Sequence, residues 1–423
     1  MRIVLFYAFI TGILITVQWV LWRRFTRWLS RAFPAQVHLG RRLMLGVFLV
    51  GNAAFAARLT VSRLGFYGTD WAQMIVRLAG LFGASIALAF LLLVMYSLLL
   101  APFRLPGWWR RRKRHTAGAD SERPSEPDSS PASPEVDIGR RRFLQLSGGV
   151  FIGASLGLPA VGALVTSYEY TVRRVPLYFP HMPPGLEGLT IAQISDIHAG
   201  AFMTERHIRE IVELINGLHP HLIVITGDFV DSSEGEIPSI YHTVGELKAE
   251  YGVFGCLGNH DHYANAAKVD SAVRQRGVIM LNNAHRVLRI NGEELALVGV
   301  DDAGRGFANH ADINRAVAGL PPEGFRILIS HRPTFFPVAR RHGMELTLSG
   351  HTHGGQVGVR VLGTEIYPVR MFHTYPKGHF VEDGKQLYVS TGVGVVGGMP
   401  IRTLEREITL FTLHTGELRP TDS

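Results

Sequence analysis

The sequence contains a single cysteine, Cys256, among 423 residues, which excludes an intrachain disulfide framework. Cys256 lies in the apolar run YGVFGCLG, where a small core side chain is expected. Charged residues are also few, at 18%, and they are unevenly distributed. Residues 1–142 hold 20 Lys/Arg against 7 Asp/Glu, whereas residues 143–423 hold 23 against 28. The C-terminal part therefore lacks the basic excess typical of nucleic-acid binding, and we expect no nucleic-acid partner.

Long stretches of the N-terminal part lack charge altogether. Residues 3–22 and 78–103 are uncharged and long enough to cross a ~30 Å hydrocarbon layer as helices. Residues 43–57 are also uncharged, although the run is short and Arg58 interrupts it. We predict a multi-span membrane region of about three helices at residues 1–104.

The basic clusters predict an orientation. Arginines between the first two spans and the run WWRRRKRH at residues 108–115 should stay cytoplasmic by the positive-inside rule. Residues 105–139 are basic and then rich in Ser and Pro, and we predict a flexible cytoplasmic linker. The protein is then a multi-pass membrane protein, with its C-terminal domain on the extracytoplasmic side and the lipid bilayer as a partner.

A further apolar segment follows the linker. RRRFLQ at residues 140–145 resembles a twin-arginine export signal, and a signal or anchor helix is predicted at residues 140–171. The twin-arginine export machinery is then an expected partner. An ordinary basic flank of a membrane helix is the alternative, and cleavage of the segment is left open.

The pattern changes at residue 172. Short apolar runs then alternate with helical stretches, which predicts a layered α/β domain at residues 172–423. We expect strands at residues 189–195, 222–227, 253–258, 295–300, 326–330, 346–350 and 387–392. Residues 204–218 place apolar side chains on one helical face, with Thr204 as the expected N-cap.

Candidate metal ligands follow several of these strands. The strand-end segments are SDIHAG, TGDFVD, GNHDH, SHRP and GHTH. Open α/β sheets place ligand sites at strand ends. The GHTH turn alone, with His351 and His353, fits a polar turn as well as a metal site. Five such strand ends in one domain favour the metal site.

The series Asp-x-His, Gly-Asp-x-x-Asp, Gly-Asn-His-Asp, His and Gly-His-x-His resembles the signature of the calcineurin-like metallophosphoesterase family. It runs from Asp196 to His353. GHTHGGQ and STGVGVVGGMPIR resemble the bacterial membrane-attached branch that bears a twin-arginine signal. The resemblance implies a four-layer αββα sandwich, here preceded by an α-helical transmembrane region. It also implies a metal-dependent phosphoesterase with two divalent ions. Mixed carboxylate and imidazole ligands suit Mn, Fe or Zn, and we favour Mn.

The resemblance assigns roles residue by residue. One ion is expected to bind Asp196, His198 and His353, the other Asn259, His331 and His351, with Asp228 bridging them. His351 and His353 would thus serve different ions. His260 would remain free to stabilise developing charge or to protonate the leaving oxygen as the catalytic residue.

Five further residues are weighed beside these ligands. Asp231 and Asp261 are candidates for holding the ligands in place, Asp261 by orienting the His260 ring. Capping of local backbone N–H groups is the alternative for both. His262, Arg332 and Arg402 are substrate candidates, and an exposed structural arginine is the alternative for the last two.

The expected reaction is phosphoester hydrolysis by attack of a metal-activated hydroxide. The membrane region points to a phosphodiester or pyrophosphate of a lipid or envelope precursor. A nucleotide or protein phosphoesterase is the alternative, as is an inactive binding module with the same fold.

Overall fold

The computed structural model describes residues 2–63, 71–90, 94, 169–321, 324–361, 364–396 and 402–419. The predicted linker at residues 105–139 and the predicted signal or anchor helix up to residue 168 lie outside the described residues. The chain divides into two compact units: Met1–Ala53 with Leu81–Val161, and Ala54–Gly80 with Gly162–Ser423.

The described N-terminal residues are helical. Helices α1 (Arg2–Ala32) and α2 (Val37–Arg63) contain the predicted spans 3–22 and 43–57. The third helix begins at Trp71, earlier than the predicted 78. By length and composition, Pro34–Arg58 and Trp71–Phe90, with mean hydropathies of 1.3 and 1.6, are apolar enough to cross a membrane. The number of crossings and their direction remain predictions.

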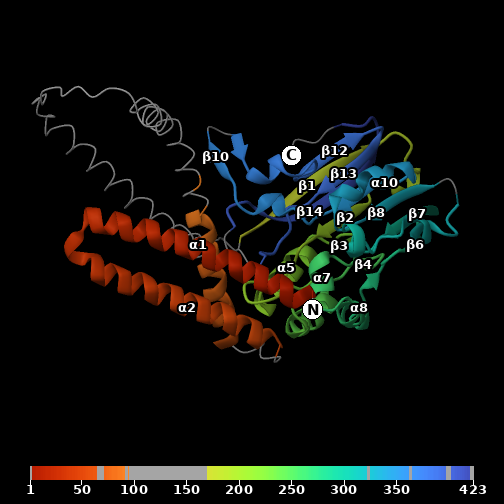
Figure 1. The fold of residues 1–423 in the computed structure, drawn as a ribbon. Coiled ribbons are helices and arrows are strands. Elements are labelled where there is room, and N and C mark those ends of the chain that lie inside the picture. Colours follow the sequence, from red (N-terminus) through yellow and green to blue (C-terminus); the bar gives the residue numbers. More distant parts are fainter. Residues whose placement is uncertain are drawn as a thin grey trace, which may run out of the picture. The chain divides into compact units, whose positions relative to one another are not determined.

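Two six-stranded mixed sheets form the C-terminal domain (Figure 1). In spatial order, the first sheet contains β1 (Tyr170–Phe179), β14 (Arg406–Thr415), β2 (Thr190–Ile194), β3 (Leu222–Thr226), β4 (Val253–Cys256) and β5 (Ile279–Met280). The second contains β12 (Gly378–Glu382), β13 (Lys385–Val389), β9 (Leu346–Ser349), β8 (Phe325–Ile329), β7 (Glu293–Gly299) and β6 (Ala284–Ile290). A small hairpin pairs β10 (Val359–Val361) with β11 (Thr364–Ile366). Each of the seven predicted strands is present.

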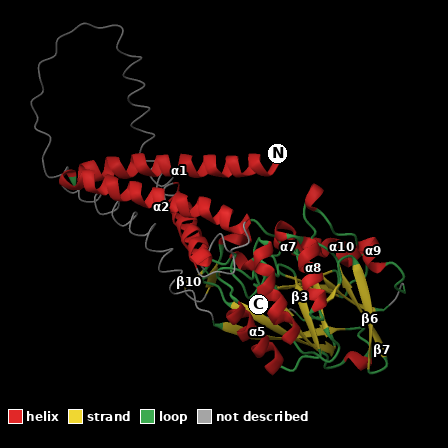
Figure 2. Cartoon of the chain, turned by 90° about the horizontal axis from the view of Figure 1, so that it is seen from below, coloured by secondary structure: helices red, strands yellow, loops and turns green. Residues whose placement is uncertain are grey.

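Helices accompany the strands (Figure 2). They are α5 (Glu205–Gly217), α6 (Ile237–Thr243), α7 (Asn259–Ala264), α8 (Ala266–Gln275), α9 (Ile313–Val317) and α10 (Phe336–Arg341). In α5, the apolar residues Ile208, Ile211, Val212 and Ile215 are buried as predicted. Thr204 precedes the helix as N-cap, and its main-chain N–H donates to His207 Nδ1 at 3.3 Å.

Three hydrophobic clusters define the layers. Side chains from both sheets share the central cluster, among them Val224 of β3 and Ile327 of β8. A second cluster joins α5, α6 and α8 to the other side of β3 through Ile225. A third joins α9 and α10 to β7 and β8 through Val298 and Leu328. The order is helices, sheet, sheet, helices, which confirms the predicted αββα sandwich.

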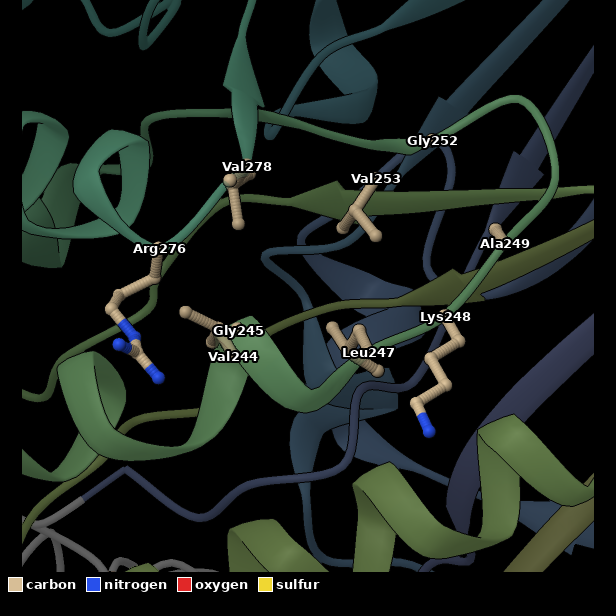
Figure 3. A pocket seen from close by; sticks show the side chains of 10 residues that line it. Val244, Gly245, Leu247, Lys248, Ala249, Gly252, Val253, Arg276 and Val278 are labelled. Atoms are coloured by element: carbon tan, nitrogen blue, oxygen red, sulfur yellow. The ribbon is translucent and has the colours of Figure 1, made fainter.

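Strand direction decides where the site lies. β2, β3 and β4 are mutually parallel, and so are β8, β9 and β13. Their carboxyl ends therefore carry the loops that hold the motif residues. A pocket of about 380 Å³, lined by Val253 at the start of β4 and by Lys248 and Arg276, lies at the amino end of that strand (Figure 3). It is separate from the motif residues, which follow the strand's carboxyl end.

Candidate metal centre

The strand ends bring the predicted ligands together in the interior. Six of them are at most 6% exposed, namely Asp196, His198, Asp228, Asn259, His331 and His353. His351 is partly buried. Buried charged and polar groups of this density require mutual pairing or a cation.

The first cluster contains Asp196, His198 and His353. The two Nε2 atoms of His198 and His353 lie 3.0 Å apart. Asp196 Oδ1 lies 3.2 Å from His353 Nε2 and 3.9 Å from His198 Nε2. One carboxylate oxygen and two imidazole nitrogens thus lie within 3.9 Å of one another.

The second cluster contains Asp228, His331 and His351. His331 Nε2 lies 3.1 Å from His351 Nδ1 and 3.2 Å from Asn259 Oδ1. Asp228 Oδ2 lies 3.1 Å from the same His331 nitrogen. The predicted second ligand set is therefore gathered around His331 Nε2.

Asp228 Oδ2, a member of the second cluster, also approaches the first, since it lies 3.6 Å from His198 Nε2. Ligand atoms of first-row metals lie ~2.0–2.2 Å from the ion, so neighbouring atoms of one shell are about 3 Å apart. The observed separations and the donor types, carboxylate, imidazole and amide oxygen, fit the ligand sets of divalent metals.

The backbone at these residues is unusual. Asp196, His198, Asp228, His351 and His353 all have positive φ, between 48° and 70°. Left-handed backbone is unfavourable for residues with a side chain and is concentrated at functional sites. Hydrogen bonds between neighbouring loops hold it here: the main-chain N–H groups of Asp196 and His198 donate to the carbonyls of Gly227 and Asp228 at 3.1 and 3.0 Å.

The ion pair between Asp228 and His331 dominates the charge balance of the site. Burial opposes ionisation of both side chains. Their mutual attraction nevertheless holds the pKa of Asp228 well below its ordinary value and raises the pKa of His331 to about 10. Burial and the adjacent positive His331 lower the pKa of His351. Burial lowers the pKa of His353 to about 4. Asp228 therefore stabilises the protonated form of His331, and a cation that binds His331 Nε2 has to displace that proton.

His260 lies beside the first cluster, with its ring centroid 4.5 Å from that of His198. Its Nδ1 is hydrogen-bonded to the Asp231 carbonyl oxygen, so Nδ1 is the donor and Nε2 is the ring nitrogen that remains for chemistry. The side chain is 19% exposed. The carboxylate of Asp231 lies 3.5 Å from His198 Nδ1, where it can fix the ring of a ligand.

Asp261 does not hold the His260 ring, in contrast to the predicted role. Its carboxylate accepts the main-chain N–H groups of Gly258, Asp228 and Val230 at 2.9, 3.0 and 3.2 Å. The capping alternative therefore describes Asp261, although the groups it caps lie in two different loops. It ties the loop after β3 to the loop after β4.

Arg332 reaches the second cluster. Its Nη1 lies 2.9 Å from His351 Nε2. Asp302, which is 2% exposed, accepts from its Nε at 2.6 Å and from its Nη2 at 3.1 Å. The guanidinium is therefore aimed at the metal centre by a buried carboxylate.

The pair Asp301 and Asp302 was missed in the sequence. It follows the predicted strand 295–300, so the rule that identified the other strand ends would have found it. Asp301 Oδ1 lies 2.7 Å from His262 Nε2. The His262 ring also stacks on His310 at a centroid distance of 4.0 Å.

Arg402 is buried rather than exposed, at 4%. Its guanidinium donates to main-chain carbonyls of Thr391, Gly392, Gly394, Leu404 and Glu405. Its Nη1 is 3.4 Å from His353 Nδ1. These contacts hold the segment after β13 beside a ligand, so the expectation of an exposed arginine is wrong.

Comparison with known proteins agrees with this geometry. Residues 189–355 match the family model of the calcineurin-like phosphoesterases. A relative, the uncharacterized metallophosphoesterase YkuE of Bacillus subtilis, is 30% identical over 296 residues, which cover 66% of this chain and 98% of the relative. The chain belongs to the calcineurin-like phosphoesterase family. Membership makes it a metal-dependent phosphoesterase.

Two other relatives show how the similarity is distributed. An uncharacterized metallophosphoesterase of Aquifex aeolicus is 30% identical over 60% of this chain and 94% of its own. A zebrafish (Danio rerio) protein named transmembrane protein with metallophosphoesterase domain is 31% identical over 55% of this chain and 54% of its own. The twin-arginine branch stays a prediction.

Proposed function

We propose that this calcineurin-like phosphoesterase is a dinuclear enzyme that hydrolyses a phosphodiester or pyrophosphate of a lipid or envelope precursor at a membrane. The observation that carries the dinuclear part is the shared position of Asp228 Oδ2, 3.1 Å from His331 Nε2 and 3.6 Å from His198 Nε2. Asp196, His198 and His353 would hold one divalent ion. Asn259, His331 and His351 would hold the other, with Mn favoured.

Two bound cations supply charge neutralisation for the phosphate oxygens and a water of lowered pKa. The chain supplies the remaining parts. Asp302 holds Arg332 so that its guanidinium can bind a phosphate oxygen through the planar fork. The Asp231 carbonyl fixes the tautomer of His260, whose protonated form can donate from Nε2 to the leaving oxygen.

The membrane part of the proposal is supported by the helices Pro34–Arg58 and Trp71–Phe90 and by the name of the zebrafish relative. We propose that the chain is anchored in the bacterial cytoplasmic membrane with the metal centre on the extracytoplasmic side. A nucleotide or a protein phosphoester is the alternative substrate.

The test uses the full-length chain in detergent with Mn²⁺. We expect hydrolysis of bis(4-nitrophenyl) phosphate that a chelator abolishes. Asp228→Asn should lower kcat/KM at least about 10³-fold because the shared oxygen is essential to both ions. The matched control is Glu294→Gln, a half-exposed carboxylate paired with Arg289 at the start of β7, and it should leave the rate unchanged.

His260→Ala gives a second, independent readout. We expect a loss of about 10²–10⁴-fold with an alkyl leaving group, which needs a proton, and a much smaller loss with 4-nitrophenolate, which does not. Absence of metal-dependent cleavage of either ester would refute the proposed function. An equal loss for both leaving groups would refute the role of His260.

A further inference from the structure

Two adjacent apolar side chains project from the domain beside the metal centre. Met371 is 82% and Phe372 81% exposed, at the end of the short 3₁₀ helix Pro368–Met371. Other exposed large apolar residues described between residues 169 and 419 are Tyr263 at 64% and, at 37–41%, Leu214, Ile279 and Val287. Single half-exposed apolar residues are ordinary, but an adjacent pair projecting this far indicates a contact surface.

The segment that bears this pair is fixed to the GHTH turn. The Thr352 hydroxyl donates to the Pro376 carbonyl at 2.5 Å. Gly355 abuts the segment so closely that a Cβ there would lie 2.9 Å from Val369 Cβ. The ring of His373, next to Phe372, lies 6.4 Å from that of His351. Met371 and Phe372 therefore stand at the edge of the second ligand cluster.

A third apolar residue stands next to the catalytic candidate. The Tyr263 ring centroid lies 5.1 Å from that of His260. The three most exposed large apolar side chains described in this domain thus neighbour residues of the metal centre. Arg370, directly before Met371, is exposed as well, which adds a cation to the surface.

The chemistry of the surface favours a lipid as its occupant. A membrane phosphoester has its charged phosphate beside acyl chains, and an exposed basic and apolar loop binds such an interface. The same chain carries helices apolar enough to cross a membrane. One of them contacts this domain at Ala201: Ala72 and Val76 pack on Ala201, and Arg77 Nε donates to the Ala201 carbonyl at 2.9 Å.

We propose that Met371 and Phe372 insert into the lipid surface and bring the metal centre to the headgroup phosphoester of a membrane-embedded substrate. The substrate class rests on the proposed function, whereas the membrane contact does not. Met371, Phe372 and Tyr263 form the apolar rim of the site.

The first experiment compares two diesters with one leaving group, using the full-length chain in phosphatidylglycerol and phosphatidylethanolamine vesicles. The substrates are soluble bis(4-nitrophenyl) phosphate and phosphatidyl-4-nitrophenol in the vesicle. The double variant Met371→Ser, Phe372→Ser should lose at least about tenfold more activity on the lipid than on the soluble diester, because each inserted side chain contributes about that factor. The matched control is the double variant Leu214→Ser, Val287→Ser, which should change the activity on neither diester. Equal effects of the rim variant on both diesters would overturn the proposal.

The second experiment observes the contact directly. Cys256 is buried and burial raises its pKa well above the ordinary value, so a thiol reagent should label only an introduced cysteine. Phe372→Cys carrying a polarity-sensitive fluorophore should shift to the blue in vesicles and be quenched by acyl-chain spin labels. Val287→Cys, on β6, should report water.

The outcomes separate the two hypotheses. A probe at position 372 that is shielded but unquenched means that a protein or a second copy covers the rim, and overturns the lipid proposal. Quenching at position 372 without metal-dependent hydrolysis leaves the membrane contact standing and refutes the proposed function. If the soluble diester is hydrolysed while the probe at position 372 reports water, the membrane contact is refuted and the metal-dependent hydrolysis stands.

Discussion

Gly258 cannot be enlarged without moving Asp228. A Cβ on Gly258 would lie 2.2 Å from Asp228 Oδ1 and 2.6 Å from the Asp228 main-chain nitrogen. Real Cβ contacts essentially never fall below 3.0 Å, so Gly258→Ala must displace one side by about 0.8 Å, the difference between 3.0 and 2.2 Å. Part of the obstruction is main chain, which cannot turn aside as a flexible side chain does.

The displacement should lower both the stability of the fold and the rate of the reaction. Overpacking of a buried position costs about 1–3 kcal/mol of unfolding free energy. A misplacement of about 1 Å in an active site lowers the rate by about 10²-fold. Since Asp228 Oδ2 faces both ligand clusters, we expect Gly258→Ala to lower kcat/KM about 10²-fold and to weaken both metal sites together.

The assay measures kcat/KM on bis(4-nitrophenyl) phosphate, bound metal per chain, and the thermal unfolding midpoint of the full-length protein. The control is Gly217→Ala at the end of α5, where nothing lies within 4 Å of an added Cβ. It removes the same backbone freedom from the unfolded chain and should leave activity unchanged. A Gly258→Ala enzyme that binds its full metal complement and keeps kcat/KM within about threefold would refute the steric reasoning.

Three further predictions concern the metal centre. The pKa of His331, about 10, means that a proton competes with metal below that pH, so calorimetry should show metal affinity rising about tenfold per pH unit between pH 7 and 9 with proton release; a flat profile would contradict the imidazolium. His351→Ala and His353→Ala should each weaken a different site, so elemental analysis should find about one ion per chain in each variant and none in the double variant. Arg402→Lys keeps the charge but leaves buried carbonyls without donors, and should lower the unfolding free energy by about 1–3 kcal/mol, visible as a lower thermal midpoint while Mn²⁺ affinity changes little.

Buried parallel strands were readable from the sequence because their runs are apolar throughout. β3 and β8 are buried along their whole length, so neither alternation nor an amphipathic face confused the pattern. The loop after each strand then placed its polar residues by topology alone. This rule identified the candidate ligands, whereas their division into two sets was implied by the resemblance to the family.

The first strand was not readable for a physical reason. β1 carries Arg173, Arg174 and Pro176, which interrupt the apolar run. Proline is tolerated in β1 because the strand pairs only with β14 in the described sheet and so lies at its edge. Arg173 in turn lies 3.2 Å from Glu405, just before β14. Such pairing across more than 200 residues is a tertiary fact that local sequence does not carry.

The role of Asp261 was predicted wrongly from the sequence for a similar reason. Its neighbour in sequence is His260, and adjacency suggested an orienting contact. The helix turn instead directs the carboxylate to N–H groups of the loops after β3 and β4. A residue one position from a functional side chain points elsewhere on a helix, so adjacency there is a poor guide to contact.

The GHTH turn shows how the ligand geometry is fixed before any ion binds. His351 and His353 both have positive φ, a conformation that costs about 1–2 kcal/mol per residue. The His351 main-chain N–H donates to both Asp196 carboxylate oxygens, at 3.0 and 3.1 Å, which offsets part of that cost. Asp196 therefore links the two clusters through the backbone as well as serving one of them. The hydroxyl of Thr352, between the two imidazoles, donates to the Pro376 carbonyl. The turn that separates two ligands therefore also fixes the segment that bears Met371 and Phe372, the surface through which a lipid phosphate would arrive.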